Sequence, residues 1–185
     1  MSSRFFPALI LLLSLSMQST AQTLAATSPL PPVTIVEKGE VLLDGEEFSY
    51  GPWNSDNSPG KVHVLQYFAG TMRASKLFEP FTDKLKAELD YTKFHITTIV
   101  NLDASLWGTT GFVVAEVKAS KKKYPKATIV LDAEGIGAEI WELGKKGAVL
   151  AVLDKDGVVQ YLTRSSMSAE EMESTLALVR AGMDS

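Results

Sequence analysis

A strand that is apolar on both faces does most to limit what this chain can fold into. Residues 61–69 read KVHVLQYFA, a β-rich run too short for a helix, and Pro59-Gly60 breaks the chain just before it. Such a run is typical of a central parallel strand covered by helices. After a turn at 69–71, apolar residues recur at spacing four as far as residue 89, which predicts an amphipathic helix kinked at Pro80.

The same stretch resembles the active-site segment of thioredoxins. Phe68-Ala69 ends the strand, a four-residue slot runs from Met72 to Ser75, and Pro80 follows the slot by five positions, as in that family. In thioredoxins the slot is Cys-x-x-Cys, whereas Met72 and Ser75 occupy the two cysteine positions here. The resemblance therefore implies the thioredoxin scaffold without its thiol chemistry.

The chain contains no cysteine at all. This excludes disulfides, zinc–thiolate sites and thiol oxidoreductase activity by the protein's own side chains. The resemblance points to two further losses, because Gln66 replaces the buried acid of thioredoxins and Ala148 replaces their cis-proline. Peroxiredoxins need Thr-x-x-Cys, and Thr71 is followed by Ala74 at the cysteine position, so cysteine peroxidase activity is excluded too.

The first 21 residues have the features of a targeting segment. Arg4 supplies a positive charge, residues 5–15 are apolar, and Ser19-Thr20-Ala21 offers small residues for cleavage before Gln22. The apolar run is short for a membrane span, although a retained membrane anchor is the alternative. We expect a cleaved signal peptide over 1–21, a periplasmic protein, and no stable membrane insertion after cleavage.

Residues 22–54 lead into the domain. Residues 22–32 are rich in Pro, Ser, Ala and Thr, and we expect a disordered linker there. Short β-rich runs at 34–36 and 41–43 flank 37–40, which we interpret as a hairpin loop. Length and ordinary globular composition then predict a single domain over 33–185.

The remainder of the chain alternates strand and helix patterns. We expect strands at 94–100, 127–131, 148–153 and 158–162, and helices at 113–124 and 168–183. The Asp-Lys-Asp-Gly sequence at 154–157 predicts a hairpin between the last two strands. Ser168 and Glu171 have the spacing of a capping box, which predicts the start of the last helix.

Several longer segments carry a closer resemblance. They are FSY at 48–50, WNS at 53–55, GKV at 60–62, TTIVN at 97–101 and VLDKDG at 152–157. With the order of elements, they resemble the peroxiredoxin and exported-thioredoxin branch, and above all the YtfJ family of small exported gamma-proteobacterial proteins. The resemblance implies a thioredoxin-like three-layer α/β sandwich with an N-terminal β-hairpin extension of peroxiredoxin or exported-thioredoxin type. It implies a compartment as well, but no activity.

Candidate binding residues gather where the first two central strands end. In open α/β sheets, ligands bind beyond the carboxyl ends of the strands. If these strands are parallel, Asn101 and Asp103 lie at the same edge as the turn after the first strand, with Trp107 nearby. The candidates from that turn are Thr71, Met72, Arg73 and Ser75. For Met72 we favour packing at the helix start over contact with a ligand, and Ser75 is expected to bond to its own helix backbone.

Charge and histidine content limit the ligands. The formal net charge is −4 without a basic stripe, which disfavours nucleic acid, and Lys121–Lys123 is expected to be the solvated end of a helix. Arg73 is either a solvated side chain or part of a site for a small anion. His63 and His95 are predicted neighbours on parallel strands, but a metal would need ligands that the sequence does not place, so we expect no metal and no cofactor.

Two functions remain open from the sequence. The first is an exported non-redox module that binds a protein, a peptide or a small anion at the Thr71–Ser75 edge. The second is an enzyme with non-thiol chemistry there, using Thr71, Ser75 or Asp103. We favour the binding module, because both histidines are expected at the far end of the sheet from Ser75. Export and acidic charge also oppose a DNA-binding regulator.

Overall fold

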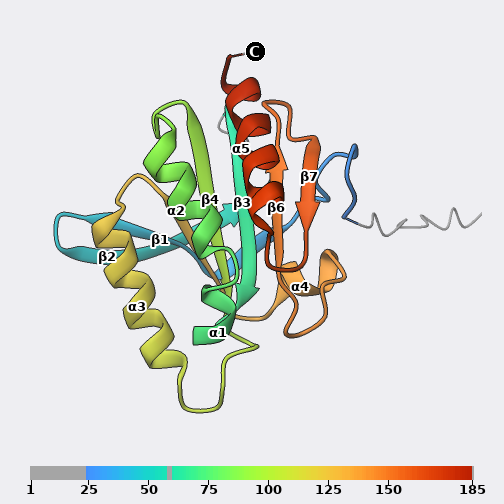
Figure 1. The fold of residues 1–185 in the computed structure, drawn as a ribbon. Helices are drawn as coiled ribbons and strands as arrows, with labels where there is room; N and C mark the ends of the chain where they lie inside the picture. The colour runs from blue at the N-terminus through green and yellow to red at the C-terminus, as the bar shows by residue number, and fades with distance from the viewer. Residues whose placement is uncertain (1–23, 58–59, 185) are drawn as a thin grey trace, which may run out of the picture.

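The computed structural model describes residues 24–57 and 60–184. A seven-stranded sheet has the strand order β2-β1-β5-β4-β3-β6-β7 (Figure 1). Its central strands β3, β4 and β5 are parallel, and the other neighbours are antiparallel. The strands are β1 Thr34–Asp44, β2 Glu47–Asn54, β3 Val62–Ala69, β4 Phe94–Asn101, β5 Thr128–Asp132, β6 Val149–Leu153 and β7 Val159–Thr163.

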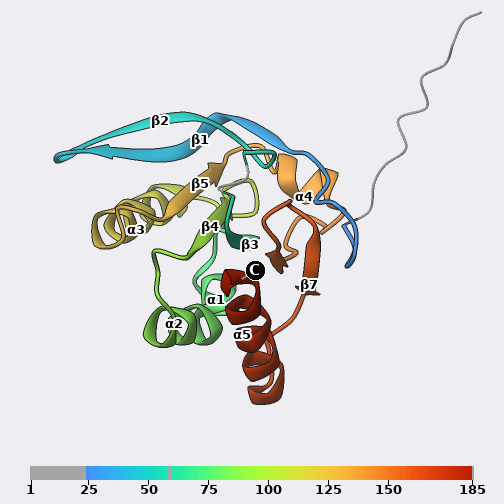
Figure 2. The same ribbon diagram turned by 90° about the horizontal axis from the view of Figure 1, so that it is seen from above.

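Helices cover both faces of this sheet. They are α1 Met72–Ser75, α2 Glu79–Glu88, α3 Thr110–Lys123, α4 Ile136–Ile140 and α5 Ala169–Asp184. Figure 2 shows α2, α3 and α5 on one face and α4 with the N-terminal segment on the other. Buried side chains separate into two hydrophobic cores accordingly, one on each face. The expected three-layer α/β arrangement with an N-terminal hairpin is confirmed.

Strand β3 is the centre of the fold, as its sequence predicts. All eight of its side chains are buried, and it pairs with β4 on one side and β6 on the other. Successive side chains of a strand point to opposite faces. Val64 and Phe68 therefore enter the core under α2 and α5, while Leu65 and Tyr67 enter the core beside α4.

The N-terminal hairpin differs in detail from the prediction. The runs at 34–36 and 41–43 belong to one strand, β1, and residues 37–40 are not a loop between two strands. The hairpin turn follows β1 at 45–46 and leads into β2. Pairing between β1 and β2 changes register between Ile35 and Glu40, so the segment predicted as a loop is a bulge within the strand.

This bulge joins the hairpin to the central sheet. Lys38 and Gly39 both have a positive φ, which is typical of a bulge as well as of a turn, and the sequence pattern does not separate the two. Lys38, Gly39 and Glu40 pair with β5. A Cβ atom on Gly39 would lie 2.2 Å from the carbonyl oxygen of Gly51, so only glycine fits at this position.

The helix predicted after β3 is divided in two, so the prediction of one helix kinked at Pro80 is wrong. α1 is one turn long, and α2 begins at Glu79 with Pro80 in its first turn. Proline is accepted there because the first backbone N–H groups of a helix have no partner inside it. Phe78, at the break, is buried in the core and fixes the direction in which α2 departs.

Residues 24–32 are packed against the domain rather than forming the disordered linker that we expected. Leu24 and Leu30 are buried in the core beside α4. The backbone of this segment exchanges hydrogen bonds with the start of β7, and Pro31 accepts one from the indole of Trp141. Composition alone missed the two leucines that hold the segment. The predicted signal peptide lies outside the described residues.

Two further observations concern helices. Lys121 is buried, and its Nζ atom donates to the carbonyl oxygen of Ala127 at 2.8 Å, so the expectation of a solvated lysine run is wrong for this residue. The long aliphatic chain of lysine allows it to cross an apolar layer and reach a polar partner. In residues 24–57 and 60–184, none of the helices combines the length and apolar character that a membrane span requires.

Candidate functional site

The parallel pairing of β3 and β4 brings the two predicted loops to one edge of the sheet. The backbone N–H of Gly70 donates to the carbonyl oxygen of Asn101 at 2.8 Å. Gly70 is held close to the facing loop, because a Cβ atom there would lie 2.4 Å from the hydroxyl of Ser105. The expected meeting of the turn after β3 and the loop after β4 is therefore confirmed.

The short helix α1 already uses both of its candidate hydroxyl groups. Thr71 Oγ1 caps the helix by accepting from the backbone N–H of Ala74 at 3.3 Å. Ser75 Oγ donates to the carbonyl oxygen of Met72 at 3.0 Å, as we predicted. Met72 is exposed, so the packing at the helix start that we favoured for it is wrong. Arg73 is exposed on a helix of only four residues, which offers little support for an anion site.

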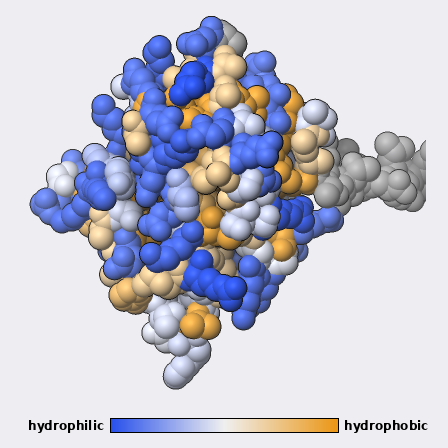
Figure 3. All heavy atoms as spheres, in the orientation of Figure 1, coloured by the Kyte–Doolittle hydropathy of each residue, from blue (hydrophilic) through white to orange (hydrophobic). Residues whose placement is uncertain are grey.

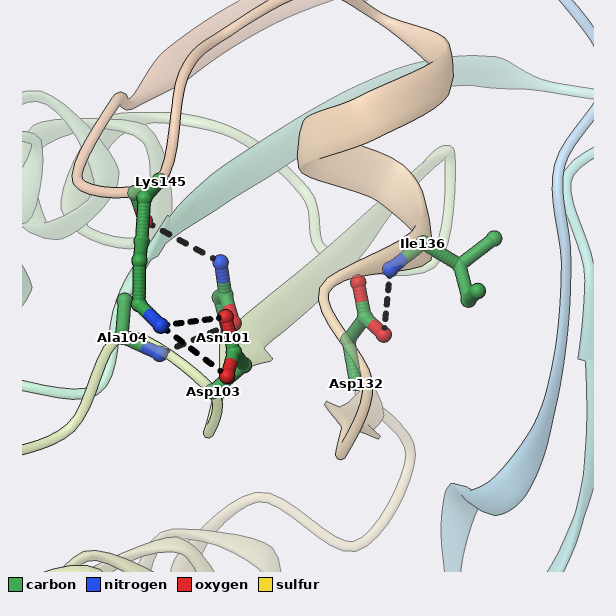
Figure 4. Close-up of polar contacts among 6 residues, drawn as sticks. All are labelled: Asn101, Asp103, Ala104, Asp132, Ile136 and Lys145. Atoms are coloured by element: carbon green, nitrogen blue, oxygen red, sulfur yellow. Dashed lines mark hydrogen bonds and ion pairs between the residues drawn. The ribbon is translucent and has the colours of Figure 1, made fainter.

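Asn101 and Asp103 belong to a different part of this edge. Asn101 is buried, with Nδ2 donating to the carbonyl oxygen of Lys145 at 3.3 Å and Oδ1 accepting from the N–H of Ala104 at 3.2 Å (Figure 4). Asp103 forms an ion pair with Lys145 at 3.0 Å. They line a small pocket of about 230 Å³ beside α4. The six predicted residues thus do not form one site.

Thr71, Met72 and Ser75 line a much larger groove, of about 690 Å³. Side chains of β3, β4 and β5 form its floor, α2 forms one wall and α3 the other. It opens at the predicted edge of the sheet and extends toward Tyr124 at the end of α3. The sequence predicts where this groove opens but not the groove itself, because the separation of α2 from α3 depends on packing of the whole domain.

The mouth of the groove is apolar. Met72, Leu106 and Phe112 line it and are exposed to 61%, 60% and 56%, and the neighbouring Trp107 is fully exposed at 101%. Figure 3 shows hydrophobic residues reaching the surface at this lower end of the molecule. Leu106 and Phe112 were not among the sequence candidates. The sequence did offer one sign for Phe112. It lies outside the apolar stripe of α3 that includes Val113 and Val117, which indicates an exposed aromatic side chain.

Polar groups line the floor and the far end of the groove. On the floor, Gln66 Nε2 donates to Thr98 Oγ1 at 2.7 Å, and Gln66 is 9% exposed. At the far end, Lys86 of α2 lies over the ring of Tyr124 at 4.4 Å. Lys86 also lies 3.6 Å from Asp83, so its charge is balanced within its own helix.

A buried polar cluster near the small pocket was not predicted. Asp132, at the end of β5, accepts hydrogen bonds from the N–H groups of Ile136 at 3.0 Å and Gly137 at 2.9 Å and from the hydroxyl of Tyr67 at 2.9 Å. The Tyr67 hydroxyl accepts in turn from the N–H of Ala138. Burial and the neighbouring Asp132 raise the pKa of Tyr67 far above its usual range. The cluster holds the start of α4 against β3.

The two histidines are neighbours, as predicted, at the opposite end of β3 and β4. Their ring centroids lie 5.3 Å apart, and each Nε2 atom is within hydrogen-bond distance of a threonine hydroxyl, His63 of Thr97 and His95 of Thr128. Burial, with His95 alongside, lowers the pKa of His63 to about 3. Among the described residues, no three His, Cys, Asp or Glu side chains are grouped closely enough to hold a metal ion.

Comparison with known proteins shows the family. The model of the YtfJ_HI0045 family, described as a bacterial protein of unknown function, matches residues 24–182. The chain is 34% identical over 169 residues to the uncharacterised protein YtfJ of Escherichia coli (strain K12), covering 91% of this chain and 92% of that protein. It is 32% identical over 165 residues to an uncharacterised Haemophilus influenzae protein, covering 89% and 90% respectively.

Solved structures show the fold. The thioredoxin domain of a thiol-disulfide oxidoreductase from Bacteroides vulgatus has a TM-score of 0.54 at 14% identity, covering 84% of this chain and 98% of that one. AhpC of Mycobacterium bovis has a TM-score of 0.56 at 13% identity, covering 86% and 93%. At such identities the likeness concerns the fold alone. The chain therefore belongs to the YtfJ_HI0045 family and has a thioredoxin-like α/β fold.

Proposed function

We propose that this protein is an exported, non-redox binding module whose site is the groove that opens at the Thr71–Ser75 edge. The observation that carries the proposal is the apolar mouth formed by Met72, Leu106 and Phe112, with Trp107 beside it. Burying a large apolar side chain is worth roughly 1.5–3 kcal/mol relative to leaving it exposed. A patch of such side chains next to a groove is typical of a binding site.

The geometry at this edge favours binding over catalysis. A serine or threonine nucleophile needs a base within hydrogen-bond reach. Here the Thr71 and Ser75 hydroxyls are bonded within α1, and Asp103 is paired with Lys145 in the other pocket. Both histidines lie at the opposite end of the strands. Met72 and Ser75, at the positions where thioredoxins carry cysteines, therefore support contact with a ligand rather than bond making.

Binding of a neutral apolar dye tests the mouth directly. We expect Nile red to bind the full chain, and Met72→Gln or Phe112→Gln to weaken that binding about fivefold to tenfold, because each removes apolar contact worth about 1 kcal/mol. The measurement is a fluorescence titration on each variant. Val36→Gln is the matched control, since Val36 is exposed on β1 and does not line the groove. Equal losses in all three variants would remove the groove as the site.

The location of the protein is part of the proposal. The apolar segment at 5–15 and the small residues before Gln22 support export through a cleaved signal peptide. We expect the protein in the periplasmic fraction with a mass that begins at Gln22, as measured by mass spectrometry of the intact chain. A full-length mass in the membrane fraction would instead indicate a retained anchor.

A further inference from the structure

We propose that the groove between α2 and α3 binds an extended apolar peptide segment, one of whose backbone amide groups is held by Gln66 and Thr98. This inference rests on the proposed function and specifies its ligand. It starts from the polar pair on an otherwise apolar floor. Ile96, Val100 and Ile129 surround this pair on the floor, and all three are buried.

The polar pair is only half satisfied within the protein. Gln66 Nε2 donates to Thr98 Oγ1 at 2.7 Å. In the part of the chain that the structure describes, three groups of this pair have no hydrogen-bond partner of their own: Gln66 Oε1, the second hydrogen of Gln66 Nε2 and the Thr98 hydroxyl hydrogen. Gln66 Oε1 is not among the fully enclosed unsatisfied atoms, so it faces the groove. The floor therefore presents an acceptor, Gln66 Oε1, beside two donors, the second Gln66 N–H and the Thr98 hydroxyl.

A peptide group matches this arrangement. It has one N–H donor and one C=O acceptor, which complement Gln66 Oε1 and the Thr98 hydroxyl. An alkyl chain would cover both groups without bonding to either, which is unfavourable for buried polar atoms. Along the middle of a helical peptide the backbone groups are bonded to each other, so only the ends of such a peptide would offer free N–H or C=O groups. An extended segment is the remaining form that leaves its backbone amides available.

The rest of the groove suits an uncharged apolar segment. Charged side chains on this side of the groove are paired with each other: Lys76, just after α1, lies 3.7 Å from Glu79 of α2, and Lys86 lies 3.6 Å from Asp83 within α2. They therefore offer no net charge for an ionic ligand. At the mouth, the exposed side chains of Met72, Leu106 and Phe112 would contact apolar side chains of the peptide, and methionine adapts well to varied shapes.

The test uses a random pool of end-capped heptapeptides selected on the full chain. We expect the recovered peptides to be rich in uncharged apolar residues. Calorimetry on recovered peptides should show that Gln66→Leu and the isosteric Thr98→Val each weaken binding about tenfold. Gln160→Leu, which makes the same change on β7 outside the groove, should leave the affinity unchanged. Thermal melts of each variant show whether the fold is intact.

Dodecanoate separates the peptide from an acyl ligand. If it binds the wild-type chain, and binds Gln66→Leu more tightly while peptides are unaffected, the groove takes alkyl chains and the inference is wrong. Recovery of no apolar peptide also overturns it. The dye titrations on the Met72 and Phe112 variants are independent of the peptide measurements on the Gln66 variant. A negative peptide result therefore leaves the proposed function unaffected. If the dye does not bind at the mouth, the proposed function itself is wrong.

Discussion

Replacing Asp132 with alanine is expected to lower the free energy of unfolding by about 3–5 kcal/mol. The carboxyl group is fully buried and accepts three hydrogen bonds, two from the first N–H groups of α4 and one from Tyr67. Alanine leaves those donors without partners in a site that water does not reach. Urea unfolding of the variant measures the change.

Asp154 provides a matched control for this experiment. It also accepts three hydrogen bonds, from the N–H groups of Asp156 and Val158 and from the side chain of Gln160, but it lies in a turn that solvent reaches. Water can replace a lost partner there, so Asp154→Ala should cost only about 1 kcal/mol. Comparable losses in the two variants would mean that burial of the Asp132 cluster has little effect.

Acidification is expected to destabilise the protein through His63 before most carboxylates titrate. The pKa of this histidine is about 3 in the folded state, compared with 6.5 as its ordinary value. Between these two pH values the unfolded chain binds a proton at His63 and the folded chain does not. The stabilising effect is complete above pH 6.5 and is lost as the pH falls from 6.5 toward 3. We expect a loss of about 2 kcal/mol between pH 7.5 and pH 5 from His63.

The variant His63→Gln isolates this effect. Glutamine keeps a polar group near Thr97 but does not titrate, so its unfolding free energy should fall less than that of the wild type over the same range. A residual slope is expected from His95, whose pKa is lowered by burial and by the charges of Lys61 and Lys121. Urea denaturation at several pH values provides the comparison, and an unchanged slope in the variant would contradict the assignment.

The sequence predicts those elements whose burial is decided locally. β3, the β6–β7 hairpin and the capping box of α5 follow from apolar runs, a turn sequence and the Ser168–Glu171 spacing, and all three are confirmed. The errors occur where a local signal has two meanings. A glycine at positive φ fits either a turn or a bulge, and a proline fits either a kink or a first turn. Only the tertiary contacts of Gly39 and Pro80 decide between these.

The candidate site is less accessible to sequence reasoning. The edge at Thr71–Ser75 can be located because strand direction is predictable, but the path of the groove depends on where α3 packs across the sheet. Phe112 lies outside the apolar stripe of α3, and Gln66 is a single polar residue in an apolar strand, so neither residue predicts a groove from the sequence. Asn101 and Asp103 share the edge with α1, yet they face the small pocket beside α4, because the loop from Leu102 to Ser105 turns them toward Lys145.

Helix α3 contacts two parts of the molecule that lie far apart in the sequence. One side of it forms a wall of the groove, and on the other side Lys118 lies over the rings of Phe48 and Tyr50 in β2, while Lys122 pairs with Glu46 in the hairpin turn. Figure 2 shows the hairpin lying along α3, away from α2. The hairpin therefore supports α3 on the side opposite the groove. A ligand that displaced α3 to widen the groove would also have to displace the hairpin. The width of the groove therefore depends partly on β1 and β2, which do not line it.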